Sequence, residues 1–433
     1  RGGEQWEAEP LRVPLLQLRE PVAEPPLLSL VLVRWDGEHA LSAGTQGEGG
    51  WGSWGAPPSD AYLAGLVERG MVTHPELSRA RAYDFEVFSL FVRDSRDVGD
   101  LASAGPWVRA ALGGLKKTVF WMVWPAEWED SADAYYSGYV GRAALFGAMR
   151  AFEGAGLHSG FPHGADLYER ITSKTWMASL CLAPEARLPA AALVGKGAVV
   201  RDAAAAARQA LAALERIRAQ RSRRAAGGAL PELASANRSG IRKGVVKLGW
   251  SWEARYVKAF VGEEQLRARM LELLCAPGCS ASTCVVQEWV DFDFEMRLYF
   301  VPPAEWDGSR RLDPVRFEGN CWFEWGSDGR PHTFRRFDDA KCVEFWQGDA
   351  EALRSAKQQA VEISQFLLTW LLSVDARPVP MIRLDFMLRR VEPGTARVVF
   401  GEYCEMGACC LSWRDGPPTT WRAALDGALR WGG

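Results

Sequence analysis

Two short stretches near the C-terminal end of the chain constrain its fold most strongly, Arg383–Leu388 and Val398–Glu405. In the first, apolar and polar side chains alternate with the period of two that is typical of a β-strand. In the second, an apolar run ends at Glu402. The residues between them, 391–397 with Pro393-Gly394 at their centre, are a turn signal, so the sequence predicts that the two strands pair as a hairpin.

This hairpin would place Asp385 and Glu402 side by side on neighbouring strands. Two adjacent carboxylates suit Mg²⁺, which takes one or two carboxylates and completes its octahedron with water and phosphate. A hairpin whose polar face points to solvent would display the same residues without any ligand. The hairpin alone leaves both interpretations open.

Length and composition bound the class of protein. The 433 residues, 48% of them apolar, indicate two or three domains with sizeable cores. The net charge of −3 argues against a dedicated nucleic-acid binder, and no apolar run approaches the roughly 20 residues that span a bilayer. Nine scattered cysteines without C-x-x-C spacing argue against zinc and predict a reducing, cytoplasmic location. The chain begins at Arg1 without Met, which predicts a fragment or a processed product.

The N-terminal part carries little readable chemistry. The first 60 residues are rich in Pro, Gly and Glu. Strand-like runs at 85–92 and 118–124, followed by a predicted helix at 132–154, give an alternation that predicts an α/β domain over residues 1–165.

Two lysines lie at positions of interest in the middle of the chain. Lys174 precedes a helix that ends near Pro184, and by itself it passes for a surface lysine. Lys247 lies on a β-branched strand and is followed by a turn at Gly249. A lysine on the polar face of a strand, beside a flexible loop, is a natural partner for phosphate because it brings a compact positive charge.

A basic run, Arg216–Arg224, closes the helix that is predicted to begin after Asp202. Such a run can contact phosphate or nucleic acid. It can also complement the dipole at the C-terminal end of a helix, and this second interpretation is favoured.

The stretch 285–300 has the cleanest alternation in the chain. Its apolar face is predicted to cover a core, while its polar face, which includes Arg297, lines either solvent or a cleft.

Taken in order, these segments resemble the ATP-grasp fold over residues 160–415. Lys174 and Lys247 are similar to the family's two nucleotide-contacting lysines. The segment Gln287-Glu288-Trp289-Val290 is similar to its adenine-binding hinge, which uses backbone groups. Arg383-Leu-Asp385-Phe is similar to its Arg-x-Asp-Phe metal strand, and Glu402-Tyr-Cys404 to its Glu-x-Asn metal strand. Agreement in order and spacing carries more weight than any one of these matches.

Two departures from the family pattern matter. The metal-binding Asn falls at Cys404, a soft ligand that suits Mg²⁺ poorly. Glu405 can take its place only if the chain turns there, because in a regular strand it points away from the face of Glu402. In the phosphate-covering loop, Trp250 and Trp252 replace most of the expected glycines.

The resemblance implies an α+β (α/β) chain with an N-terminal α/β domain and an ATP-grasp domain at 166–433. A lid subdomain is expected at about 190–290 and a metal-binding core at about 291–415. The metal ligands implied are Asp385, Glu402 and Glu405. The cofactors implied are ATP and Mg²⁺, with Mn²⁺ as a substitute.

The activity implied is an ADP-forming ligase that joins a small-molecule or peptide carboxylate to an amine or thiol. Arg297 and Arg383 would clamp phosphate or the substrate carboxylate, unless they serve only in ion pairs. The alternative is a degenerate protein that binds nucleotide without catalysis, to which Cys404 and the Trp-rich loop point. The substrate and the oligomeric state are not readable from the sequence.

Overall fold

The computed structural model describes residues 15–19, 25–35, 85–128, 139–225, 241–250, 256–322, 334–404, 413 and 415–431. The chain divides into two compact units. The first consists of residues 1–125, 131–165 and 413–433, and the second of residues 126–130 and 166–412. Within the described ranges, no helix is both long and apolar enough to cross a membrane.

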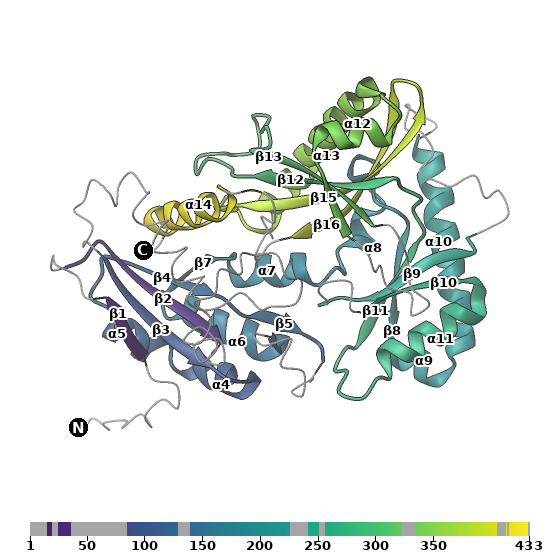
Figure 1. The fold of residues 1–433 in the computed structure, drawn as a ribbon. Helices are drawn as coiled ribbons and strands as arrows, with labels where there is room; N and C mark the ends of the chain where they lie inside the picture. Colours follow the sequence, from purple (N-terminus) through teal and green to yellow (C-terminus); the bar gives the residue numbers. More distant parts are fainter. Residues whose placement is uncertain are drawn as a thin grey trace. The chain divides into compact units, whose positions relative to one another are not determined.

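The first unit is built on a sheet of five strands: β1 (Leu15–Arg19), β2 (Leu28–Trp35), β3 (Phe85–Val92), β4 (Lys116–Trp121) and β7 (His158–Phe161). The strand order is β1-β3-β2-β4-β7, and every pairing is parallel except that of β1 with β3 at the edge (Figure 1). Buried parallel strands read as continuous apolar runs, which is why this α/β alternation was legible in the sequence.

The other elements of the first unit are mainly helices: α4 (Ser95–Asp100), α5 (Gly105–Ala111), α6 (Arg142–Gly154) and α14 (Gly416–Trp431), with the short strands β5 (Trp124–Ala126) and β6 (Tyr139–Gly141). The helix predicted at 132–154 therefore begins only at Arg142, and residues 129–138 lie outside the described part of the chain.

The C-terminal helix α14 belongs to the first unit, whereas the sequence placed it with residues 166–433. Its Trp421 ring lies 4.7 Å from Phe161 and 5.8 Å from Phe120, centroid to centroid. The amphipathic pattern of a helix indicates that it covers an apolar surface but does not identify that surface. Local sequence therefore does not determine which unit α14 packs against.

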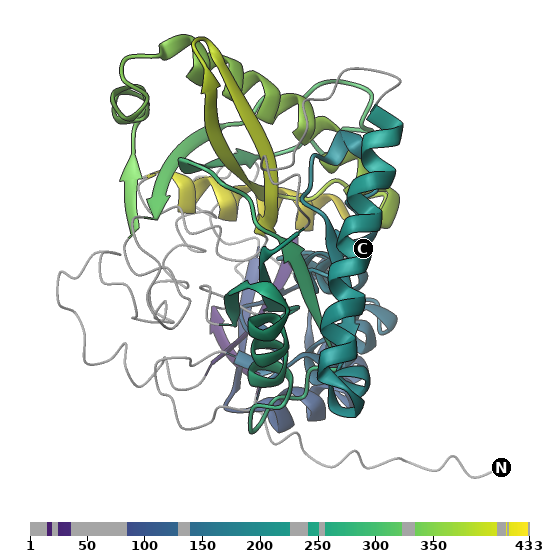
Figure 2. The same ribbon diagram turned by 90° about the vertical axis from the view of Figure 1, so that its right-hand side faces the viewer.

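The second unit contains a four-stranded antiparallel sheet, called here the small sheet: β8 (Ala191–Gly195), β9 (Lys243–Leu248), β10 (Val257–Val261) and β11 (Thr283–Glu288). Its order is β10-β9-β11-β8. The helices α9 (Lys196–Arg201), α10 (Ala203–Ala225) and α11 (Gly262–Leu274) accompany it. Figure 2 shows the long α10 running beside this sheet, and apolar residues of α10 and α11 share one core with β9 and β11. As predicted, α10 follows Asp202, whose Oδ1 accepts a hydrogen bond of 2.9 Å from the Ala205 amide.

A second, five-stranded sheet of the same unit is called here the site sheet: β12 (Phe294–Phe300), β13 (Arg316–Trp322), β14 (Phe334–Phe337), β15 (Ile382–Glu392) and β16 (Thr395–Cys404). Its order is β14-β13-β12-β15-β16, antiparallel throughout. The helices of this region are α7 (Ala165–Thr172), α8 (Met177–Leu180), α12 (Asp339–Phe345) and α13 (Ala350–Val374). The apolar side of α13 packs against the apolar face of the sheet, so the opposite, polar face is left to carry a site.

The predicted hairpin is present as β15 and β16, and its register places Asp385 directly opposite Glu402. The turn is shorter than the seven residues 391–397 that the sequence indicated, because the ladder continues to the pair Glu392–Thr395. Apart from the buried Ala396, the residues of these extra pairs are polar or exposed, and they pair through backbone groups without an apolar pattern that sequence could reveal.

The stretch 285–300 forms two strands rather than one, β11 in the small sheet and β12 in the site sheet. Its apolar residues Phe294, Met296, Leu298 and Phe300 are buried in the core as predicted. The break between the strands lies at residues 289–293, so one alternating sequence links the two sheets that carry the candidate site.

Candidate active site

The polar face of the site sheet carries one continuous row of charged side chains. Register pairs Glu318 on β13 with Arg297 on β12, Arg297 with Asp385 on β15, and Asp385 with Glu402 on β16. Residues directly opposite one another in an antiparallel sheet share a face and have Cβ atoms about 5 Å apart. Two predicted metal ligands and one predicted clamp therefore lie in a single row.

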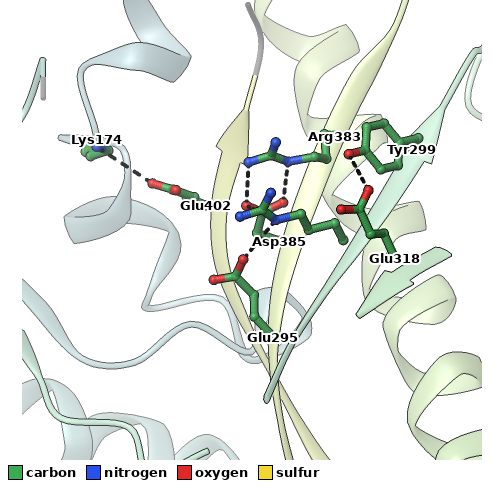
Figure 3. Close-up of polar contacts among 8 residues, drawn as sticks. Lys174, Glu295, Tyr299, Glu318, Arg383, Asp385 and Glu402 are labelled. Carbon is green, nitrogen blue, oxygen red and sulfur yellow. Dashed lines mark hydrogen bonds and ion pairs between the residues drawn. The ribbon is translucent and has the colours of Figure 1, made fainter. Parts of the chain in front are cut away.

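Arg383 and Asp385 form a buried bidentate pair in the middle of this face (Figure 3). Arg383 Nε donates to Asp385 Oδ1 and Nη2 donates to Oδ2, each at 2.8 Å. Burial alone would lower the pKa of Arg383, but the Asp385 carboxylate outweighs it and the pKa lies well above the ordinary value. The third guanidinium nitrogen, Nη1, is buried and has no hydrogen-bond partner in the described part of the chain. It is a candidate donor for a bound anion.

Arg297 and Glu295 extend the charged network along β12. Arg297 Nε lies 3.0 Å from Glu295 Oε1 and 3.8 Å from Asp385 Oδ2. Burial raises the pKa of Glu295, and the nearby Asp385 carboxylate adds to this effect, although Arg297 opposes it. Glu295 shares the polar face of its strand with Arg297, and the sequence assigned it no role.

Both lysines singled out from the sequence lie near Glu402. Lys174 Nζ is 3.7 Å from Glu402 Oε2, and Lys174 adopts the left-handed backbone conformation with φ of 54°. Burial raises the pKa of the Glu402 carboxyl, but four cations (Lys174, Lys247, Arg383 and Arg297) outweigh burial and hold the pKa below its ordinary value. Glu402 therefore stays ionised.

Lys247 is buried on β9, with 8% of its surface exposed. Burial, with repulsion from Lys174, lowers its pKa to about 7, and Glu402 opposes the shift only in part. A buried cation near a second cation favours the binding of a polyanion. A bound phosphate would offset both the desolvation of Lys247 and its repulsion from Lys174.

Gly249, just beyond β9, lets the two lysine-bearing segments approach. A Cβ at Gly249 would lie 2.4 Å from the carbonyl oxygen of Ser173, the residue before Lys174. The turn that carries Lys174 thus packs directly against the end of the strand that carries Lys247. Trp250 is described and buried, while Trp252 lies outside the described residues.

The predicted hinge, residues 287–290, closes the small sheet against the segment that precedes β8. Glu288 donates its amide to the Ala190 carbonyl at 2.9 Å, and the Ala190 amide donates to Glu288 Oε1 at 2.8 Å. The Trp289 amide donates to the Lys243 carbonyl at 3.0 Å. These two amides are used within the fold and are therefore not available to a base.

Gln287 is buried on the same face of β11 as Val285, which pairs with Lys247. Its Oε1 accepts no hydrogen bond from any described residue. An unsatisfied amide oxygen on the face that carries Lys247 is a candidate acceptor for a ligand donor.

The basic run on α10 does more than complement the helix dipole. Arg218 Nε lies 3.6 Å from Glu288 Oε2, and Arg221 Nη1 donates to the Leu188 carbonyl. Burial raises the pKa of Glu288, with the Ala190 amide, Arg218 and Arg221 opposing it. These two arginines brace the hinge, which the favoured interpretation from sequence missed.

The third metal position is Cys404, the last residue of β16, two residues after Glu402 and opposite Arg383. Glu402 and Cys404 therefore share the polar face, and Glu405 lies outside the described residues. Within the described ranges, no group of three His, Cys, Asp or Glu residues is arranged to hold a metal ion. Two opposed carboxylates nevertheless fit Mg²⁺, because this ion takes one or two carboxylates and completes its shell with phosphate and water.

No protein-family model and no curated protein sequence matches the chain. Among solved structures, the D-cycloserine synthetase DcsG aligns with a TM-score of 0.50 at 17% identity, covering 92% of this chain and 99% of DcsG. The VanG D-Ala:D-Ser ligase from Enterococcus faecalis aligns with a TM-score of 0.48 at 12% identity, covering 94% and 100%. The D-alanine–D-alanine ligase from Bacillus anthracis, complexed with ATP, aligns with a TM-score of 0.44 at 10% identity, covering 93% and 96%.

The chain therefore has the mixed α/β ATP-grasp fold, which confirms the fold predicted from the order and spacing of its motifs. The evidence for this fold is the alignment with DcsG, which is an enzyme of the ATP-grasp superfamily.

Proposed function

We propose that the chain is an ATP-dependent, ADP-forming ligase that activates a substrate carboxylate as an acylphosphate. One observation carries the proposal. Asp385 and Glu402 stand opposed on neighbouring strands, with Lys174 at 3.7 Å from Glu402 and Lys247 close enough to lower its pKa. A pair of acids flanked by two lysines meets the needs of a metal–polyphosphate complex. The shared fold with the synthetase DcsG supports the same class of reaction.

In this proposal Asp385 and Glu402 hold Mg²⁺, with Glu405 as the predicted further ligand, and Mn²⁺ takes the same oxygen ligands. When bound, the ion neutralises negative charge on the phosphates. Lys174 and Lys247 would neutralise negative charge on those phosphates. The adenine base lies against the hinge segment Gln287–Val290, with Gln287 Oε1 as a side-chain acceptor.

The reaction then has two steps. An oxygen of the substrate carboxylate attacks the γ-phosphorus, the bond to the β–γ bridging oxygen breaks, and ADP leaves. An amine or thiol attacks the acyl carbon, inorganic phosphate departs, and the nucleophile loses its proton to the medium. Arg383, through its unpartnered Nη1, and Arg297 stabilise the negative charge on the transferring phosphoryl group and the acylphosphate.

The substitution Asp385→Asn tests the proposal. Mg²⁺-dependent ADP release is measured by a coupled assay over a panel of amino acids, peptides and small carboxylic acids. We expect the variant to lose about 10²–10³-fold in rate, the size of effect seen when a charge-stabilising group leaves an active site. We expect the variant to fold, because its amide oxygen still accepts one hydrogen bond from Arg383. Circular dichroism checks this expectation.

The matched control is Asp313→Asn, which alters an exposed carboxylate of the same unit that lies 3.6 Å from Arg311. The control should keep wild-type activity. Equal rates for wild type and Asp385→Asn would contradict the ligase proposal. Tight Mg-ATP binding with no ADP release from any acid would instead identify the non-catalytic alternative.

A further inference from the structure

Glu318, on β13, is a buried carboxylate that forms no ion pair with any residue that the structure describes. Only 3% of its surface is exposed. Its Oε2 accepts a hydrogen bond of 3.1 Å from the Tyr299 hydroxyl, and its Oε1 is buried and accepts none within the described ranges. No described Lys, Arg or His lies within ion-pair distance of it. The sequence did not single out this residue.

The cations of the polar face are oriented toward other acids. Arg297 sits directly opposite Glu318 in the sheet register, yet its Nε lies 3.0 Å from Glu295 and 3.8 Å from Asp385. Arg383 is committed to Asp385 through two bonds of 2.8 Å. Glu295, Asp385 and Glu402 each lie beside a cation. Glu318 differs from them, because no cation of the described residues lies within ion-pair distance of it.

A buried carboxylate that lacks a cation is expensive to maintain, since desolvation penalises its charge and leaves an acceptor unmade. Its position explains why the fold retains it. Glu318 ends the row that contains the candidate metal ligands Asp385 and Glu402, so its free oxygen belongs to the same face as the proposed reaction.

We propose that Glu318 recognises a cationic nitrogen of the substrate, with Tyr299 holding its carboxylate in place. This inference rests on the proposed ligase function and names its substrate class: an amino acid or another aminated carboxylic acid, rather than a simple carboxylic acid. The ammonium donates to Glu318 Oε1, and the anionic part of the substrate turns toward Arg383 Nη1, which, like Arg316 Nε, is a buried nitrogen without a hydrogen-bond partner among the described residues.

The spacing of the two groups is compatible with one small substrate. Arg383 lies on β15 and Glu318 on β13, with Tyr299 of β12 between them. Two strand spacings amount to roughly 10 Å at the backbone. Figure 3 shows Tyr299 and Glu318 on the side of Arg383 that is away from Lys174 and Glu402. The cation site is therefore separate from the groups proposed to hold nucleotide and metal.

The test compares matched acids with and without an amino group: alanine against propionate, 4-aminobutyrate against butyrate, and glutamate against glutarate. Equilibrium binding of each is measured by calorimetry to the full chain with Mg²⁺ and a non-hydrolysable ATP analogue. We expect at least one aminated acid to bind about 10- to 100-fold more tightly than its partner, the range for a hydrogen bond to a charged group.

Glu318→Gln keeps the size of the side chain and an acceptor for Tyr299 but removes the charge. We expect it to lose the preference for the aminated acid and to leave binding of the deaminated acid unchanged. Glu318→Asp keeps the charge and should retain a preference. The control Glu344→Gln alters an exposed glutamate that pairs with Lys341, and it should behave as wild type.

The outcomes separate the two proposals because the binding measurement does not require turnover. A Glu318-dependent preference without ADP release from any acid overturns the ligase proposal alone. ADP release from acids that bind equally well with or without an amino group overturns the cation site alone. A preference that persists in Glu318→Gln also overturns the cation site. If that variant does not fold, equal binding of the aminated and deaminated acids to wild type overturns the cation site.

Discussion

Lys247 offers a direct test of the electrostatics of the candidate site. Its pKa of about 7 in the folded protein lies far below the ordinary value of 10.5, because the amine is buried and faces Lys174. Between these two pH values the unfolded chain binds a proton that the folded chain has released. Stability therefore rises with pH in this window, and below about pH 7 the full penalty of the buried charge is present.

The magnitude follows from linkage. Each pH unit in the window contributes about 1.4 kcal/mol, and the half-titrated group at the lower limit reduces the first increment. From pH 7 to pH 9 the contribution of Lys247 to the free energy of unfolding should become more favourable by about 2 kcal/mol. Lys247→Met removes the titrating group and keeps an unbranched chain of similar length.

The assay is urea denaturation of wild type and Lys247→Met at pH 7, 8 and 9, followed by circular dichroism. We expect the variant to gain most relative to wild type at pH 7 and least at pH 9. Lys243→Met, on an exposed position of the same strand, controls for loss of a lysine and should shift stability equally at all three pH values. Parallel pH profiles for wild type and Lys247→Met would refute the reasoning.

Two further substitutions test packing around the site. Gly249→Ala should reduce ADP release at least 10-fold, because the new Cβ would lie 2.4 Å from the Ser173 carbonyl oxygen and displace the turn that carries Lys174. Wild-type activity would show that the close contact between Gly249 and Ser173 is not needed. Tyr403→Phe should lower the free energy of unfolding by about 1 kcal/mol, since the hydroxyl donates at 3.0 Å to the Leu367 carbonyl inside the core, and unchanged denaturation midpoints would count against it.

The sequence by itself determined the strands that have one apolar face buried in a core. Period-two alternation placed Arg383–Leu388 and the apolar half of 294–300 in strands, and turn chemistry paired the hairpin that opposes Asp385 and Glu402. Register follows from such patterns because a slip of one residue would carry the whole apolar set to the wrong face. The order of these elements along the chain was enough to identify the ATP-grasp fold.

The tertiary structure alone decided the groups whose role depends on distant neighbours. Lys174 by itself passed for a surface lysine, and the order of the motifs marked it as a nucleotide contact, but only the fold shows it 3.7 Å from Glu402. The contacts of Arg218 and Arg221 with the hinge, and the isolation of Glu318 beside Tyr299, join segments that are remote in sequence. Local periodicity encodes which side chains are buried, but the charge around a buried group is set by whatever the fold packs against it. That is why Asp385, Glu402 and the two lysines could be predicted from the chain, while the hinge contacts of the α10 arginines and the environment of Glu318 could not.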